Sequence, residues 1–244
     1  EHKKLFNRMF ERNPSVPLAL LRTGQSEEAE TLLFDAHQRT KNRLGEKHGK
    51  TANWGMLLAM IIGLVTAVLR LSGSFAGRIV ATVYLEIIRN TPLLVQVSIF
   101  YFVLQPILGI NNPIWTGILC LAFFEGTFAS EIIRAGINSV PKGQWEAGTS
   151  IGLSRAKTYI YIILPQAIPL MLPPMTGILV NLIKHSAILS FIAVFELTTE
   201  ARNLIGDTFM SFEVWFVVGP MYLVLTISLS TLVAWMERRI RRRR

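Results

Sequence analysis

Apolar segments long enough to cross a lipid bilayer recur along this chain, and they constrain its fold more than any other feature. A membrane-spanning helix needs about 20 mostly apolar residues. Since backbone groups in lipid must find partners within the segment, we expect helices, and the predicted fold class is all-α integral membrane. The sequence offers five such segments, at Thr51–Leu71, Arg78–Leu104, Pro113–Arg134, Thr158–Leu182 and Phe212–Met236.

Composition agrees with a membrane protein. Of 244 residues, 51% are hydrophobic and only 17% are charged, which argues against a soluble domain of this length. The net charge is +9, but the basic residues flank apolar segments, which indicates membrane anchoring and not nucleic-acid binding. The single cysteine, Cys120, excludes a disulfide framework or a cysteine metal site within the chain.

Prolines predict bends in two of the spans. Asn90, Thr91 and Pro92 interrupt the second span, where a missing backbone donor should bend the helix. The fourth span is expected to be distorted by its four prolines, which are Pro165, Pro169, Pro173 and Pro174.

A polar loop rich in small residues, EAGTSIGLSRAKTYIYIILP, separates the third and fourth spans. We expect a short helix from Glu146 to Ile151, a sharp turn at Gly152, and a second helix with Ser154 as its N-cap. Pro165 would kink that second helix about three turns along. The pattern predicts a helix-turn-helix finger at the membrane edge, suited to docking a partner.

This loop resembles the EAA loop of the membrane subunits of binding-protein-dependent ABC importers. The resemblance rests on residue types and spacing, and it departs at Gly148, where the family often has alanine; glycine there would loosen the first helix by about 1 kcal/mol. It implies that the loop couples the chain to an ATPase, with Glu146 and Ala147 in a buried first helix. The matching residues are Glu146, Ala147, Gly152, Ile162, Leu164 and Pro165.

Three further stretches resemble the permeases of polar amino acid importers: Tyr84–Gln96, Ser130–Gly148 and Ile183–Leu197. The resemblance implies about five transmembrane helices of the type I ABC importer kind. It also implies two such subunits, as homodimer or heterodimer, two ATPase subunits that bind ATP and Mg, and a periplasmic or extracytoplasmic binding protein. The implied function is translocation of a polar amino acid across the bacterial inner membrane by alternating access, driven by ATP hydrolysis on a separate subunit.

The resemblance covers residues 49–244, which we expect to form the transmembrane domain with its coupling loop at about 140–165. Residues 1–48 are polar, with partial helical patterning, and we expect them to form a separate segment that is helical, lies on the membrane surface or contacts a partner. Lys and Arg outside this segment fall on one side of the predicted spans, so the coupling loop and C-terminus should be cytoplasmic. With five spans, the basic N-terminal segment would then lie on the side opposite the cytoplasm. This conflicts with the rule that Lys and Arg are enriched on the cytoplasmic side.

Placing a polar side chain inside the bilayer costs free energy, so polar residues within the spans are candidates for a functional role. Gln96 and Glu125 lie in the second and third spans, and Asn181, His185 and Ser186 lie near the end of the fourth. We interpret them as candidates for the substrate pathway, with helix packing or an internal ion pair as the competing account. His185 stands where relatives often have an acid, which favours neutral polar or acidic ligands over cationic ones.

No catalytic or metal-binding constellation is found in the sequence, so a transport subunit without its own cofactor is expected. Gly45–Thr51, GEKHGKT, comes near a phosphate-binding loop but lacks its four-residue glycine spacing. ATP and Mg are therefore assigned to the partner ATPase. The alternatives are an ion-gradient-driven transporter, which paired acids in broken helices would favour, and a membrane scaffold without a solvated cavity.

Overall fold

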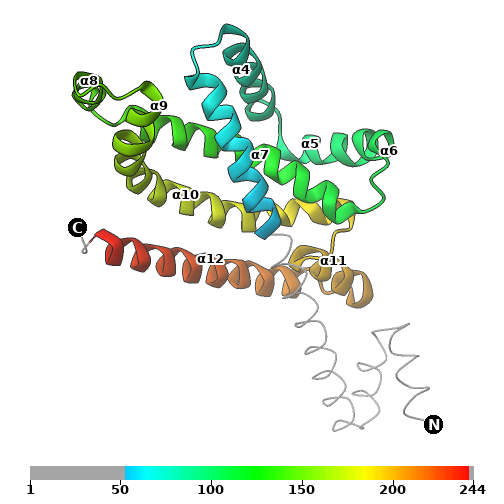
Figure 1. The fold of residues 1–244 in the computed structure, drawn as a ribbon. Helices are drawn as coiled ribbons and strands as arrows, with labels where there is room; N and C mark the ends of the chain where they lie inside the picture. The colour runs from blue at the N-terminus through cyan, green and yellow to red at the C-terminus, as the bar shows by residue number, and fades with distance from the viewer. Residues whose placement is uncertain (1–52, 242–244) are drawn as a thin grey trace, which may run out of the picture. The chain divides into compact units, whose positions relative to one another are not determined.

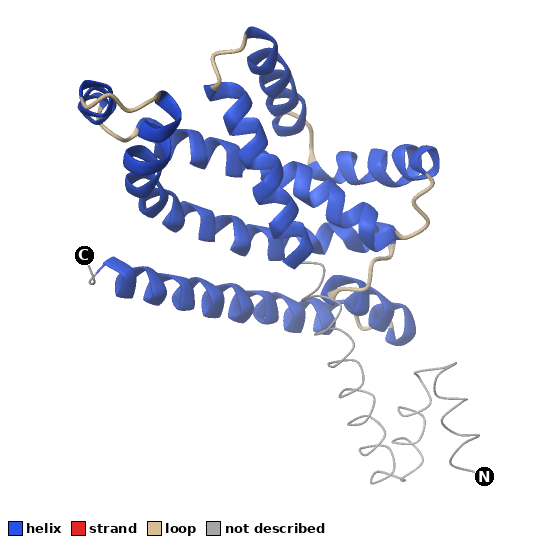
Figure 2. Cartoon of the chain, in the orientation of Figure 1, coloured by secondary structure: helices blue, strands red, loops and turns tan. Residues whose placement is uncertain are grey.

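The computed structural model describes residues 53–241, and the predictions made for residues 1–48 lie outside them. Within this range every regular element is helical (Figure 2). The described chain forms two compact units, residues 53–194 with 222–241, and residues 195–221.

Among residues 53–241, four helical segments are long and apolar enough to cross a membrane, and a fifth arises if two helices joined by a sharp bend count as one span. This matches the predicted number, although the fourth segment is longer than expected. It runs without a break to Ile192 because η3, Ala187–Ile192, continues α10, Leu164–Ser186. The four segments are Asn53–Leu71, α7 (Pro113–Asn138), Arg155–Ile192 and Ser211–Trp235, the last within α12 (Ser211–Arg241).

The predicted bend in the second span is present, and it divides the span into two helices that run in clearly different directions. α4, Phe75–Arg89, meets the helical arm Leu93–Leu108 at 108°. Pro92 has no N–H to offer the carbonyl of Ile88, and the side chain of Gln96 donates to that carbonyl instead, at 2.6 Å. The arm consists of α5 (Leu93–Ile99), η1 (Phe100–Leu104) and α6 (Gln105–Leu108).

The core of the larger unit forms where α7 and α10 pack side by side in opposite directions (Figure 1). Ile133 and Ile137, late in α7, share one buried cluster with Met171 of early α10. At the other end, Leu121 of early α7 packs with residues from late α10, α5 and η3. About two thirds of the apolar stretch of α7 is buried, so α7 is the central helix of this unit.

Small residues bring Asn53–Leu71 close to α7. A Cβ on Gly63 would lie 2.5 Å from the Cβ of Ala129, and one on Gly126 would lie 2.8 Å from Ile62 Cγ2. Such close backbone approach is typical of helix pairs in membranes, where packing contacts drive association.

The smaller unit contains α11, Leu197–Thr208, with Glu196 as its N-cap. The buried Glu196 carboxylate accepts hydrogen bonds from the backbone N–H (2.6 Å) and the hydroxyl (3.1 Å) of Thr199. One turn on, burial and then the nearby Glu196 charge raise the pKa of the Glu200 carboxyl. The helix ends at Phe209, which has a left-handed backbone (φ 59°) and is 90% exposed.

Candidate functional site

The loop between α7 and α10 forms the predicted helix-turn-helix finger. α8, Lys142–Ser150, ends in a Schellman motif, in which the N–H of Leu153 bonds to Gly148 and that of Gly152 to Thr149, both at 3.0 Å. Gly152 has φ 76°, a conformation that glycine adopts without strain. Ser154 caps α9, Arg155–Thr158, by accepting from the N–H of Lys157, as the sequence predicted.

Gly148 is the contact point between the two helices of the finger, which the sequence did not reveal. It is the buried residue of α8, and a Cβ at this position would lie 2.5 Å from Cγ2 and 2.7 Å from Oγ1 of Thr158. Trp145 and Tyr159 close the same contact with an edge-to-face ring pair, 5.4 Å between centroids. The glycine that was expected to loosen α8 thus permits tight packing in the finger.

The predicted kink at Pro165 takes the form of a π-helical turn placed just before it. η2, Tyr159–Ile163, joins α9 to α10, and the N–H of Leu164 reaches back five residues to the carbonyl of Tyr159. The turn absorbs the disruption by Pro165, and α10 then stays α-helical through its other prolines. Leu164 and Pro165 are therefore the first residues of the core helix.

Glu146 and Ala147 are exposed in this chain, so the first helix of the finger is not buried within it. Glu146 of α8 and Arg155 of α9 both line a shallow cleft between these two helices. Ile151 at the tip and Tyr161 in η2 are also exposed, at 72% and 70%. The finger thus presents polar and apolar groups that a partner protein can cover.

Two of the substrate-pathway candidates meet inside the larger unit. Nδ1 of His185 lies 2.5 Å from Oε1 of Glu125, which is 1% exposed. The imidazole also packs edge-on against Phe124, 5.3 Å between centroids, and its side chain is one third exposed. The geometry joins a buried carboxylate on α7 to a partly accessible imidazole on α10.

Gln96 has a different environment. Its Nε2 donates to the carbonyls of Ile88 and Thr91 and to the Thr91 hydroxyl, at 2.6–3.0 Å, which fixes its amide at the bend. Its Oε1 is buried, and no group of the described part of the chain bonds to it. Asn181 is exposed, and the hydroxyl of Ser186 donates to the carbonyl of Ile183 at 2.7 Å.

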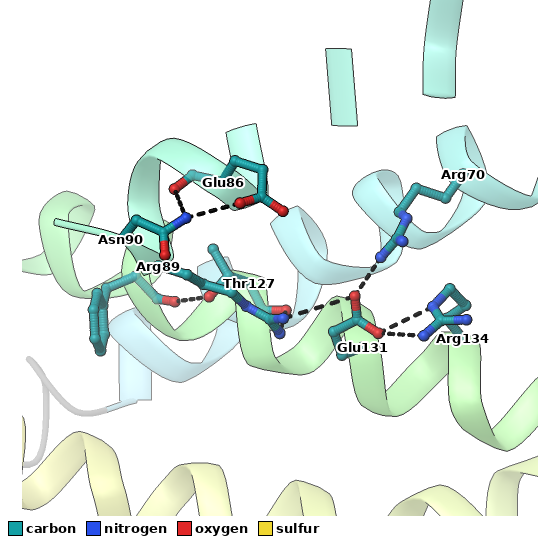
Figure 3. Close-up of polar contacts among 8 residues, drawn as sticks. Arg70, Glu86, Arg89, Asn90, Thr127, Glu131 and Arg134 are labelled. Atoms are coloured by element: carbon teal, nitrogen blue, oxygen red, sulfur yellow. Dashed lines mark hydrogen bonds and ion pairs between the residues drawn. The ribbon is translucent and has the colours of Figure 1, made fainter. Parts of the chain in front are cut away.

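A cluster of charged residues that the sequence analysis did not select surrounds Glu131 on α7 (Figure 3). Its carboxylate pairs with Arg70 and with Arg134 (2.7 Å), and Arg89 approaches to 3.8 Å. Arg89 also donates to the carbonyl of Thr127 at 3.0 Å and lies over the ring of Phe128. We call these four charged residues, Arg70, Arg89, Glu131 and Arg134, the Glu131 cluster.

Glu86 and Arg89 are three positions apart on α4, a spacing that favours an ion pair along one helix, but the structure gives each of them another partner. Among the described residues, Glu86 accepts from the side chain of Asn90 at 2.8 Å, whereas Arg89 turns toward α7 (Figure 3). Helical spacing suggested a local pair, but the packing of α4 against α7 offers Arg89 partners on a second helix. The sequence did hold a signal for this contact between helices, because arginine and glutamate residues stand near the ends of different spans.

Comparison with known proteins agrees with this architecture. Residues 57–242 match the family model described as "Binding-protein-dependent transport system inner membrane component". The chain is 38% identical over 183 residues to the probable glutamine ABC transporter permease protein GlnM of Bacillus subtilis, covering 75% of this chain and 84% of GlnM. It is 38% identical over 187 residues to the L-cystine transport system permease protein TcyB of the same organism, covering 76% and 80%.

A solved structure is similar as well. The crystal structure of an amino acid ABC transporter with histidines aligns with a TM-score of 0.76 and 32% sequence identity. The alignment covers 86% of this chain and 97% of the solved chain. The match therefore extends over nearly the whole of that subunit.

Proposed function

Since the chain belongs to the family of inner membrane components of binding-protein-dependent transport systems, we propose that it is the permease subunit of an ABC importer for a polar amino acid. It is a multi-pass membrane protein and a transport subunit. ATP hydrolysis on a separate subunit would drive alternating access. The names of the relatives GlnM and TcyB support an amino acid as the substrate.

The observation that carries the coupling part of this proposal is the rigid connection between the finger and the core. The Schellman turn at Gly152, the contact of Gly148 with Thr158, and the π turn before Leu164 form one continuous path from α8 into α10. A force applied to α8 is thereby transmitted to the helix that packs along α7. Glu146 and Ala147 are exposed on α8 to receive it.

The proposed partners follow from this arrangement. Two ATPase subunits, which bind ATP and Mg, would dock the fingers on the cytoplasmic side, where the basic C-terminus also lies. A second permease subunit, identical or homologous, would complete the pathway, and a binding protein would deliver the amino acid from the other side. Lys142, Arg155 and Lys157 lie within the finger and favour its cytoplasmic placement.

The pair formed by Glu125 and His185 would set the substrate class. A buried carboxylate within a span attracts a cation, but here its Oε1 is already in contact with Nδ1 of the imidazole at 2.5 Å. The site therefore has no unpaired carboxylate for the side chain of lysine or arginine. We favour neutral polar or acidic amino acids, with Gln96, Asn181 and Ser186 as further pathway candidates.

The test of coupling uses the complex reconstituted in liposomes with its ATPase and binding protein. Substrate-stimulated ATP hydrolysis and uptake are measured for wild type, Gly152→Pro and the control Gly143→Ala, whose added Cβ meets open space. Proline cannot adopt φ 76°, so Gly152→Pro should insert normally but hydrolyse ATP without uptake. Normal uptake by Gly152→Pro would reject the coupling role, and ATP-independent uptake that follows an ion gradient would reject the importer.

The substrate class is tested in the same liposomes with a panel of unlabelled amino acids. Glutamine is expected to compete with uptake of the labelled substrate, and lysine and arginine are not. Effective competition by lysine would contradict the role given to the Glu125–His185 pair while leaving the importer assignment intact.

A further inference from the structure

The Glu131 cluster carries more positive charge than its carboxylate needs. Three guanidinium groups surround one carboxylate, so the cluster has a net charge of +2. Each guanidinium has five N–H donors, yet the three together make only four hydrogen bonds within the described chain. Their side chains are 24–37% exposed. Most of these donors therefore have no hydrogen bond within the described chain, and those that are exposed can bind an anion.

The position of the cluster places it at a membrane surface. Arg70 is the penultimate residue of the first span, Asn53–Leu71, and Arg134 lies one turn before the end of α7. Arginines at the ends of spans lie at the level of lipid headgroups. Basic sites between helices at this level are able to bind anionic headgroups.

An apolar groove lies next to the cluster, between α4, the arm Leu93–Leu108 and α7. It encloses about 380 Å³, and its open walls are entirely apolar. The polar atoms of two lining residues are turned away into hydrogen bonds, Tyr84 to the carbonyl of Phe123 and Thr116 to Gln105. Ile87, Ile88, Phe100, Leu104, Leu119 and Phe123 form its walls.

The groove and the cluster follow one face of α7. Leu119 and Phe123 line the groove, and Thr127 and Glu131 follow at intervals of four residues, which places all four on one side of a helix. On α4, Ile88 lines the groove and the next residue, Arg89, belongs to the cluster. At 1.5 Å per residue, Glu131 and Leu119 are about 18 Å apart along the axis, close to the roughly 15 Å depth of one leaflet.

We propose that this face of α4 and α7 is a binding site for an anionic phospholipid. The phosphate lies against the guanidinium groups of Arg70, Arg89 and Arg134, and one acyl chain lies in the groove. Charge and apolar surface are thus matched to the two ends of a single lipid molecule. The site is separate from the Glu125–His185 pair, so the inference does not depend on the identity of the transported substrate.

The test measures lipid binding to the full chain, delipidated in neutral detergent, by native mass spectrometry. Phosphatidylglycerol, phosphatidylcholine with the same acyl chains, and inorganic phosphate are titrated separately. Wild type is expected to retain one phosphatidylglycerol in preference to phosphatidylcholine. Arg134→Gln should weaken that binding about fivefold, which corresponds to about 1 kcal/mol for one arginine near an anionic headgroup.

A second variant tests the groove without changing charge. Ile87 is 58% exposed, and Ile87→Trp should fill the groove and weaken phosphatidylglycerol binding at least fivefold. The controls are Arg78→Gln and Ile79→Trp, exposed positions of α4 outside both the cluster and the groove, which should bind as wild type does. Monodisperse elution and an unchanged circular dichroism spectrum establish that each variant is folded.

Three results would overturn the proposal. Equal retention of phosphatidylcholine would show that charge is not recognised. Full occupancy by inorganic phosphate with no effect of Ile87→Trp would indicate a free-anion site. Binding unaffected by Arg134→Gln and Ile87→Trp would leave the Glu131 cluster as a link between helices and nothing more.

Discussion

His185 and Glu125 lie 60 positions apart in sequence, yet Nδ1 of the first and Oε1 of the second are separated by 2.5 Å. The contact joins late α10 to the middle of α7, the two helices that form the core of the larger unit. In the function proposed above, it leaves Glu125, the carboxylate among the pathway candidates, already in contact with an imidazole and so less open to a cationic ligand. The pair is therefore a link within the core and, in the proposed function, a determinant of ligand charge.

Loss of the imidazole should destabilise the chain. His185→Ala leaves the buried Glu125 carboxylate without its partner, and we expect a loss of about 3 kcal/mol in the free energy of unfolding, measured in detergent. Glu125→Gln combined with His185→Ala should lose clearly less than the two single variants added together. Additive losses would contradict a direct interaction between the two side chains.

A methyl group at position 148 should separate the helices of the finger. Gly148→Ala places a Cβ 2.5 Å from Thr158 Cγ2, and overpacking of this kind costs about 1–3 kcal/mol. Hydrogen–deuterium exchange of residues 142–158 should accelerate, above all at the N–H of Leu153. The double variant Gly148→Ala with Thr158→Ala removes the obstructing atoms and should restore slow exchange, while Thr158→Ala alone serves as control.

Replacement of Gln96 should weaken the bend between α4 and α5. Gln96→Leu keeps the size of the side chain but removes the donor from the partly buried hydrogen bonds to the carbonyls of Ile88 and Thr91, a loss of about 2 kcal/mol in the free energy of unfolding. Spin labels at the exposed positions Val80 and Val103 should report a broader distance distribution. Ser98→Ala, which removes an exposed hydroxyl on the same helix, should change neither measurement.

The stability of the chain should carry a pH dependence from Glu200. Its folded-state pKa is raised from an ordinary value of 4.5, so the folded state binds its proton more tightly than the unfolded state. The resulting stabilisation is fully present below pH 4.5 and is lost as the pH rises through the raised value. Gln at position 200 does not titrate, so Glu200→Gln should lose less stability than wild type between pH 4.5 and 8. In acid the two proteins should unfold at similar temperatures. Parallel pH profiles would exclude this contribution.

Much of the architecture could be predicted from the sequence because it depends on local signals. Span number followed from apolar length, the bend from Pro92, and the finger turn from Gly152 and Ser154, each of which acts within a few residues. The polar residues of the spans were also recognisable, since such residues are costly in lipid. None of these signals reports which of those residues meet.

Contacts between distant segments escaped prediction for a physical reason. The spacing along α4 favours a pair between Arg89 and Glu86. Arg89 instead approaches the carboxylate of Glu131 on α7, which is 42 positions later in the sequence (131 − 89). The effect of Gly148 was predicted from helix propensity alone, whereas its role in packing depends on Thr158 in the next helix. Propensity and spacing describe one helix, and these roles are set where two helices touch.

The π turn at Tyr159–Ile163 has a consequence for how the finger and the span tolerate sequence change. One additional residue in a helical turn rotates everything before it by about 100° relative to everything after it. The exposed side of α9 is thus turned by about this angle from the direction that an uninterrupted helix would give it relative to the face that α10 buries against α7. Deletion of one residue from the turn would rotate the finger about the core helix without changing a single side chain of either, so the length of this turn is itself a determinant of where the finger points.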